Sequence, residues 1–379
     1  MVKKCLVTGL ISVSIFISSQ AYSFPYKGLD IKVEGGINEM YDDNITITSD
    51  AEKQKEDYIT NLSLELGVKH EGRTRNIVFS GRTNQQFYAD NNNLDRNSQN
   101  FSLNFTNEIS DNQRISIEDV YTHLYEPSGF EDSFGRPEGR YSTYKNRLNL
   151  RYEIDVADGV SVSTSYANEK TDVSRDDMQD SSLDRYGVEA KYFPGLATAF
   201  TCSYGFVSNK LDDGAKAATQ SVALGLRQNI TKNFYFNLSA GEDFIETFDG
   251  NEDTAENYQG SLTNEISENT LATLSFSKKK QSISNREDMF DSWQASGGLT
   301  KTISEKVKSS FSGFYGEGEY SVSGLAEKLR GVQLGFDYEF REDVRWDLSY
   351  AYSAVDYTAL TSSSGYTRNT ISLGLKMGF

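Results

Sequence analysis

The chain has 379 residues, of which 37% are hydrophobic and 12% aromatic, and its formal net charge is −17. Binding to phosphates requires a basic surface, so we expect no nucleic-acid partner. The composition is too polar for helices that cross a membrane, but it suits transmembrane β-strands, in which only every second residue faces lipid.

The N-terminal residues have the pattern of a secretory signal peptide. Lys3 and Lys4 precede an apolar run over 5–17, and the small residues Ala21 and Ser23 follow it. The run is too short to span a bilayer. We therefore predict a cleaved signal peptide at 1–23 and one domain at 24–379, whose single thiol, Cys202, can form neither an internal disulfide nor a multi-cysteine metal site.

Alternation of apolar and polar residues recurs through the rest of the chain. In 57–71, for example, Leu62, Leu64 and Leu66 share one face, with Ser63 and Glu65 on the other. Segments of about ten to thirteen residues suit tilted membrane strands. The predicted strands are 29–41, 57–71, 75–88, 99–109, 114–125, 142–154, 160–170, 184–193, 197–209, 217–228, 233–245, 256–266, 270–280, 290–303, 307–318, 330–340, 344–356 and 367–379. The pattern thus predicts about 18 strands.

The connections between these strands alternate between short and long. The short ones are 72–74, 110–113, 157–159, 194–195, 230–232, 267–269, 304–306 and 341–343. The long ones lie near 42–56, 89–98, 126–141, 171–183, 210–216, 246–255, 281–289, 319–328 and 357–366. A soluble solenoid or multi-sandwich protein does not predict this alternation, whereas an outer-membrane barrel has short periplasmic turns and long external loops. We predict an all-β fold, a transmembrane antiparallel up-and-down β-barrel with both termini on the periplasmic side.

The last segment, 367–379, places Ile371, Leu373, Leu375 and Met377 on one face and ends on the aromatic Phe379. It resembles the closing strand of bacterial outer-membrane β-barrels. In that class the terminal aromatic residue is an assembly signal, and the resemblance implies this role for Phe379.

Charged residues occupy the polar face that would line the lumen. The basic candidates are Arg82, Lys145, Arg147, Arg151, Arg185, Lys191, Arg227, Lys308 and Arg345, and the acidic ones are Glu65, Glu118, Glu153, Glu189, Glu265, Asp337, Glu339 and Asp347. Lys145, Arg147 and Arg151 share one strand face. They could form one wall of an anion-attracting constriction, or they could pair with Glu118 and Glu153. A barrel of this size leaves an aqueous channel unless a loop fills it. The best candidate for such a loop is 126–140, which could equally lie outside.

No catalytic constellation is recognisable. The only histidines, His70 and His123, lie on the apolar faces of their strands, whereas a catalytic histidine would have to face the lumen or a groove beside a nucleophile and an acid. The sequence contains no phosphate-binding glycine loop and no metal-ligand spacing. Acidic residues in the long connections are explained by solvation. We therefore predict no enzymatic activity and no cofactor.

The first hairpin resembles a particular family. Residues 41–45 (Tyr-Asp-Asp-Asn-Ile), followed by 57–60 (Asp-Tyr-Ile-Thr) and Leu62, Leu64 and Leu66, are similar to the entry of the β-barrel porin 2 group. Such barrels often accompany exopolysaccharide synthesis and secretion, so the resemblance implies a conduit for a polysaccharide, with periplasmic export proteins as partners.

Three functions follow as hypotheses. The first is a conduit or accessory barrel for exopolysaccharide secretion, the second is a diffusion porin for general or specific solutes, and the third is a surface adhesin or structural barrel. All three predict a Gram-negative cell outer membrane, contact with its lipid and lipopolysaccharide, and insertion by the barrel assembly machinery.

Overall fold

The computed structural model describes residues 28–126, 134–135, 139–283, 285–359 and 362–379. The predicted signal peptide lies outside the described residues. The strands are β1 (Asp30–Asp42), β2 (Asp57–Glu71), β3 (Arg75–Tyr88), β4 (Arg96–Ser110), β5 (Gln113–Glu126), β6 (Tyr141–Ala157), β7 (Val160–Val173), β8 (Ser181–Gly195), β9 (Thr198–Leu211), β10 (Lys216–Asn229), β11 (Phe234–Glu246), β12 (Glu252–Ser267), β13 (Thr270–Ser282), β14 (Met289–Ser304), β15 (Val307–Tyr320), β16 (Ala326–Arg341), β17 (Val344–Ala359) and β18 (Ser362–Gly378). A single 3₁₀ turn, η1 (Asn92–Leu94), follows β3.

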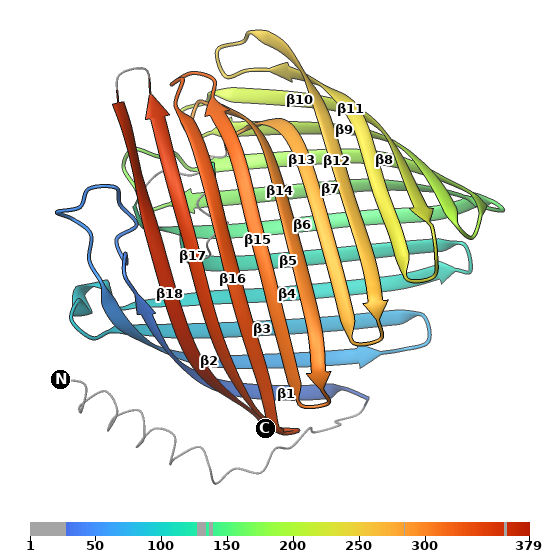
Figure 1. Ribbon diagram of the computed structural model, residues 1–379. Helices are drawn as coiled ribbons and strands as arrows, with labels where there is room; N and C mark the ends of the chain where they lie inside the picture. The colour runs from blue at the N-terminus through green and yellow to red at the C-terminus, as the bar shows by residue number, and fades with distance from the viewer. Residues whose placement is uncertain (1–27, 127–133, 136–138, 284, 360–361) are drawn as a thin grey trace.

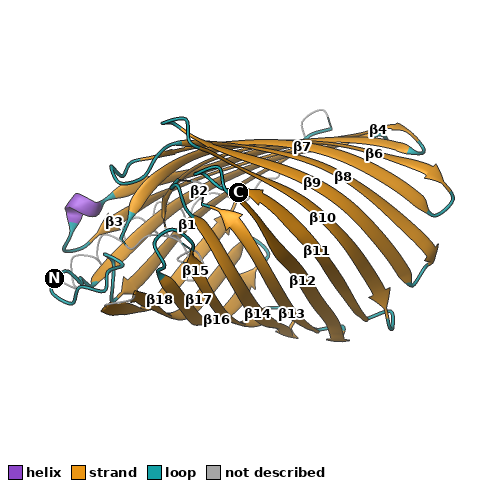
Figure 2. Ribbon diagram, turned by 90° about the horizontal axis from the view of Figure 1, so that it is seen from above, coloured by secondary structure: helices purple, strands orange, loops and turns teal. Residues whose placement is uncertain are grey.

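The strands form one closed antiparallel barrel. Each strand pairs with its neighbours in the chain, and β1 pairs with both β2 and β18, which closes an 18-stranded sheet. Figure 1 shows β11 to β18 crossing in front of β2 to β9, and Figure 2 shows the same wall from above. Closure leaves no unpaired edge. The predicted fold class and strand number are confirmed.

The two ends of the barrel differ in their connections. One end carries the connections 72–74, 111–112, 158–159, 196–197, 230–233, 268–269, 305–306 and 342–343; the other carries 43–56, 89–95, 127–140, 174–180, 212–215, 247–251, 283–288, 321–325 and 360–361. We call the strand portions beside the first set the turn half and those beside the second the loop half. β1 begins and β18 ends in the turn half.

One predicted long connection is wrong. Residues 357–366 are not a loop, because β17 continues to Ala359 and β18 starts at Ser362, with their register running from Tyr357–Ser364 to Ala359–Ser362. The length contrast also fades along the chain, since 212–215 is no longer than 230–233 on the opposite end.

The outward face carries its aliphatic side chains mainly in the turn half, whereas in the loop half charged residues and exposed aromatic rings such as Tyr58 and Phe87 share it. On β16, Leu334, Phe336 and Tyr338 are exposed in the turn half, whereas Lys328 and Arg330 hold the same face in the loop half. On β2, Leu62, Leu64 and Leu66 are exposed, and toward the loops Thr60 and then the exposed aromatic ring of Tyr58 follow them on the same face. Apolar side chains that would be costly to expose to water therefore form a band around one half of the barrel.

Within the described ranges, the structure contains no helix that is long and apolar enough to cross a membrane.

Candidate functional site

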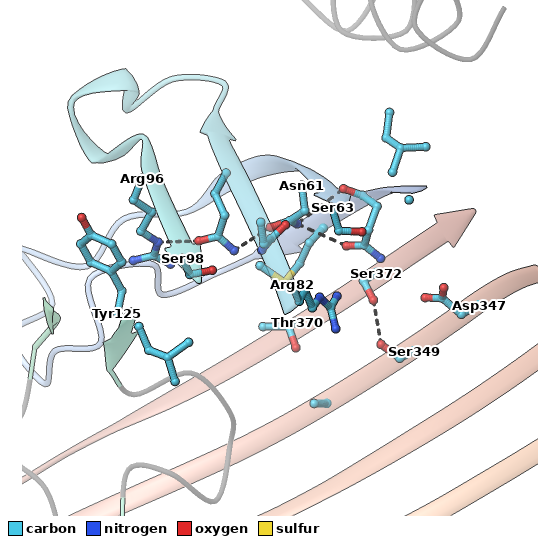
Figure 3. Close-up of a pocket in the computed structure, with 18 of the residues that line it drawn as sticks. Asn61, Ser63, Arg82, Arg96, Ser98, Tyr125, Asp347, Ser349, Thr370 and Ser372 are labelled. Carbon is cyan, nitrogen blue, oxygen red and sulfur yellow. Dashed lines mark hydrogen bonds between the residues drawn. The ribbon is translucent and has the colours of Figure 1, made fainter. Parts of the chain in front are cut away.

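A cavity of about 560 Å³ runs along the inner wall formed by β1 to β5 and β16 to β18. Asp347 and Lys376 line it near the short turns, and Arg96, Arg140 and Arg368 line it near the long connections. Figure 3 shows Arg82, Thr370 and Ser372 between Arg96 and Asp347. The strand alternation explains this lining, because it places amides, hydroxyls and charges on the face opposite the apolar band.

A row of amides crosses four strands and ends on an arginine. The register places Asn38, Asn61, Gln86 and Arg96 side by side on β1 to β4. Asn61 donates to Asn38 Oδ1 at 3.3 Å, Gln86 donates to Asn61 Oδ1 at 2.6 Å, and Arg96 Nε donates to Gln86 Oε1. This row fixes the direction in which Arg96 points (Figure 3).

Three arginines gather around one buried carboxylate, and we call Arg96, Arg140 and Arg368 with Asp42 the arginine cluster. Arg368 Nη2 lies 2.8 Å from Asp42 Oδ2, and Arg140 Nη2 lies 3.3 Å from the same atom. Arg96 lies over the rings of Tyr88 and Tyr125, with its Cζ 5.3 and 5.0 Å from their centroids. Asp42 is 0% exposed, so this carboxylate is shielded from bulk water, while the three arginines line the cavity.

The charges in this cluster do not balance. Burial, followed by repulsion from Arg96 and Arg368, lowers the pKa of Arg140 to about 9. Asp42 offsets only part of this effect. A guanidinium stays protonated under ordinary conditions, so the lowered pKa of Arg140 describes the cost of burying its charge and, after that, repulsion from Arg96 and Arg368, rather than loss of a proton.

The predicted lumen charges form ion pairs along the wall of β5 to β8. Arg151 lies 3.3 Å from Glu153 and 3.2 Å from Glu189, and Arg147 lies 4.0 Å from Glu118. Lys145 and Arg185 both approach Glu169, at 3.7 and 3.6 Å. Arg82, on β3, pairs with Glu65 at 3.2 Å. Pairing of this kind was one of the two predicted alternatives for this wall.

Sequence reasoning missed the residues that matter most in the loop half. Glu169 and Arg368 were readable from strand alternation, since each lies on the inward face of its strand. Arg96 precedes the predicted start of its strand, and Arg140 belongs to a connection. No periodicity could have placed either residue in the lumen.

The connection 43–56 folds into the lumen. Ile45 packs with Ile59 and Tyr88, and Ile47 packs with Leu329, Val355 and other apolar residues of the inner wall. Ile47 has a φ of 51°, a left-handed conformation that is strained for a β-branched residue. The packing of a side chain that is 1% exposed offsets this strain.

The described residues of the connection 127–140 also lie inside. The Phe134 ring meets those of Phe290 and Phe314 edge-on, at centroid distances of 5.2 and 5.7 Å. The Gly135 N–H donates to both oxygens of the buried Glu327, at 3.1 and 3.2 Å. Of the rest of the predicted inward loop, Glu126 is the last residue of β5, Gly139 and Arg140 are described, and 127–133 and 136–138 lie outside the described residues.

Two further connections meet between strands that are not neighbours. Gln179, in 174–180, and Asn285, in 283–288, exchange hydrogen bonds, from Gln179 N to Asn285 O at 3.0 Å and from Asn285 Nδ2 to Gln179 O at 2.9 Å. Arg286 also pairs with Asp177 at 3.3 Å. Contacts among the connections thus narrow the mouth of the loop half from several sides.

The C-terminal residue is fixed beside the closing strand. The Phe379 N–H donates to Val33 O at 2.7 Å, and its side chain lines an outward groove with Ile37 and Leu375. Its role as an assembly signal stays a prediction. Among the described residues, no group of three or more His, Cys, Asp or Glu side chains is placed to hold a metal ion.

Comparison with known proteins shows the fold. No protein-family model matches this chain, and no curated protein matches its sequence. Among solved structures, it is similar to OccK1 (OpdK) of Pseudomonas aeruginosa, alone and with vanillate, each with a TM-score of 0.51, 11% identity, and coverage of 92% of this chain and 99% of that chain. OccAB4 of Acinetobacter baumannii is matched with a TM-score of 0.48 and 11% identity over 94% of this chain and 100% of that one. The chain therefore has the fold of the outer-membrane β-barrels.

Proposed function

We propose that the protein is an outer-membrane channel through which small hydrophilic solutes diffuse. The observation that carries this proposal is the polar cavity of about 560 Å³ inside a closed barrel whose outer face is apolar in the turn half. Barrels of sixteen to eighteen strands are wide enough to leave an aqueous channel. A lumen lined by hydroxyls, amides and paired charges can pass a solute without retaining it.

The orientation of the barrel in the membrane follows from the difference between its turn half and its loop half. The apolar band suits lipid, and the polar outward face of the loop half suits the headgroups and sugars of lipopolysaccharide. The turn half then spans the hydrocarbon layer, and the longer connections face outward. Both ends of the barrel sheet lie on the periplasmic side, and we expect the barrel assembly machinery to insert the chain from there.

A wide conduit for exopolysaccharide is less compatible with the loop half. Ile45, Ile47 and Phe134 occupy the lumen at the mouth, where a hydrated glycan would need polar surface. The resemblance of the first hairpin to the β-barrel porin 2 group is what supports the conduit, with polysaccharide and periplasmic export proteins as its partners. The hypothesis of a surface adhesin does not explain why a cavity lined by polar side chains lies inside the barrel.

Liposome swelling with sugars of increasing size separates these functions. Purified protein in liposomes should admit monosaccharides and disaccharides and exclude long oligosaccharides. Entry of long glycans at similar rates would favour the conduit. Absence of any swelling, together with absence of conductance in planar bilayers, would contradict a channel and favour a surface role.

A further inference from the structure

The arginine cluster contains more cations than its surroundings neutralise. Arg96, Arg140 and Arg368 face one carboxylate, and in the part of the chain that the structure describes only Asp42 lies within ion-pair distance of any of them. Arg96 and Arg368 are about nine-tenths buried. Buried charges are costly unless they are paired, so among the described residues the cluster has fewer negative charges than positive ones.

The hydrogen-bond donors of the cluster are also incompletely used. Arg96 donates through Nε to Gln86, and its two Nη groups have no partner among the described residues. Arg140 donates through Nε to Ile45 O and through Nη2 to Asp42, which leaves Nη1 without a described partner. Guanidinium groups with free N–H bonds favour planar oxygen anions, which they bind in a bidentate manner.

A third observation comes from a neighbouring hydroxyl. Tyr88 is 3% exposed, and its buried Oη has no hydrogen-bond partner among the described residues. This hydroxyl interacts electrostatically with all three arginines. A buried donor without a partner is unfavourable, and an anion held by the arginines would give it one.

The cluster also opens onto the transport path. Arg96, Arg140 and Arg368 line the same cavity as Arg82 and Lys376, whereas Asp347 is the single acidic residue among the described residues of that lining. Arg82 is neutralised by Glu65, so the unbalanced charge is concentrated at the cluster. An anion in the cavity would therefore stop at this point.

We propose that the arginine cluster binds a small oxyanion, a carboxylate or a phosphate group, held by Arg96 and Arg140 and contacted by the Tyr88 hydroxyl. This inference rests on the proposed channel for its biological meaning, since it names the class of solute that the channel would select. The alternative is that the arginines only fasten the connections, as Arg140 does at Ile45 and Asp42. Arg96 and Tyr88 distinguish the two, because neither hydrogen-bonds to a connection through its side chain among the described residues.

Calorimetric titration of the detergent-solubilised protein tests the site without requiring conductance. Inorganic phosphate and acetate are titrated separately in chloride-free buffer. Saturable binding of either anion is expected, and the difference between them identifies the preferred source of the oxyanion. In Arg96→Gln the dissociation constant should rise about ten- to a hundred-fold, because a charge-assisted pair is lost.

Two further variants keep the test interpretable. Tyr88→Phe removes the unpartnered hydroxyl with almost no change in volume, so it should fold normally and bind about three- to ten-fold more weakly. Arg330→Gln is the matched control, because Arg330 lies on the outward face of β16 and pairs with Asp356 at 3.7 Å. It should bind as the unmodified protein does.

Absence of saturable binding of both anions to the unmodified protein would overturn the inference, as would equal weakening by Arg330→Gln and Arg96→Gln or unchanged affinity in Tyr88→Phe and Arg96→Gln together. The proposed channel is judged separately by swelling and conductance. A conducting protein that binds neither anion keeps the channel and loses the site, whereas a binding protein that does not conduct keeps the site and loses the channel.

Discussion

The turn half and the loop half of the barrel have opposite polarity. In β16, Leu334 faces outward and is 49% exposed, while Asp337 faces inward beside the short turns. In the loop half of the same strand the pattern is different. Lys328 faces outward there, and its neighbour Leu329 faces inward and is 0% exposed. Along β16, therefore, the turn half is apolar outside and polar inside, whereas the loop half is charged outside and packed with apolar residues inside. On other strands the outward face of the loop half also carries exposed aromatic rings, such as Tyr58 and Phe87.

This difference indicates that the two halves of the same sheet face different surroundings, lipid around the turn half and water around the loop half. Where lipid surrounds the sheet, apolar side chains face outward and water occupies the lumen. Beyond the lipid, the same strands behave like a soluble β-sheet and bury apolar side chains against the inward connections. The arginine cluster lies where these two regimes meet, which explains why charged groups there are buried and still reach the cavity.

The largest effect should come from removing the carboxylate at this junction. Asp42→Asn leaves Arg140 and Arg368 without their counter-charge, and loss of one partner from a buried ion pair costs about 3–5 kcal/mol. We expect the amide N–H groups of Ile45 and Ile47, which bond to Lys55 O and Asn44 O, to exchange much faster with solvent. Asp343→Asn, at the exposed pair with Arg341, is the control and should leave that exchange unchanged. If these amides were equally protected from exchange in both variants, Asp42 would not stabilise the inward connection of the loop half.

Two leucines of one strand provide a direct test of the inversion. Leu329→Ala creates a cavity among Ile47, Phe314 and Val355, so it should cost about 2–5 kcal/mol in unfolding free energy. Leu334→Ala should cost less, because lipid or detergent chains can fill the space outside. Denaturant unfolding in detergent compares them. A larger loss for Leu334→Ala would reverse the assigned polarity of the loop half.

The inward connection 127–140 should limit the width of the channel. Phe134→Ala removes a ring that packs against Phe290 and Phe314, so single-channel conductance should rise. Replacement of Phe311, which is exposed on the outward face of β15, provides a matched control and should leave conductance as it was. Unchanged conductance in Phe134→Ala would show that this ring does not restrict the path.

The smallest change in unfolding free energy is expected when an ion pair of the turn half is removed. Arg151 is partly exposed and shared between Glu153 and Glu189. Exposed pairs contribute about 0–1 kcal/mol because water and salt screen them, so Arg151→Gln should change unfolding free energy by no more than that. A loss comparable to that of Asp42→Asn would show that the two halves do not differ in their electrostatics.

Strand alternation predicted the strands of the turn half well, because there every second residue faces lipid and is apolar while the residues between face the lumen and are polar. The same rule failed at 357–366. Thr358 and Ser363 there lie on the outward face above the apolar band, and Tyr357 and Tyr366 are buried inside, so a polar stretch that reads as a loop is in fact strand. The positions of Ile45, Phe134 and Arg140 could not be predicted for another reason, although 126–140 was the candidate for an inward loop. These residues come from connections, and their positions depend on long-range packing that has no period in the sequence.

Quenching of tryptophan fluorescence by brominated lipids tests the inverted polarity most directly. In a background with Trp293 and Trp346 replaced by phenylalanine, single tryptophans are placed at Leu334, Lys328 and Leu329. The structure predicts strong quenching at Leu334 and little at Lys328 or Leu329. Equal quenching at Leu334 and Lys328 would contradict it, because lipid would then cover the outward face of both halves.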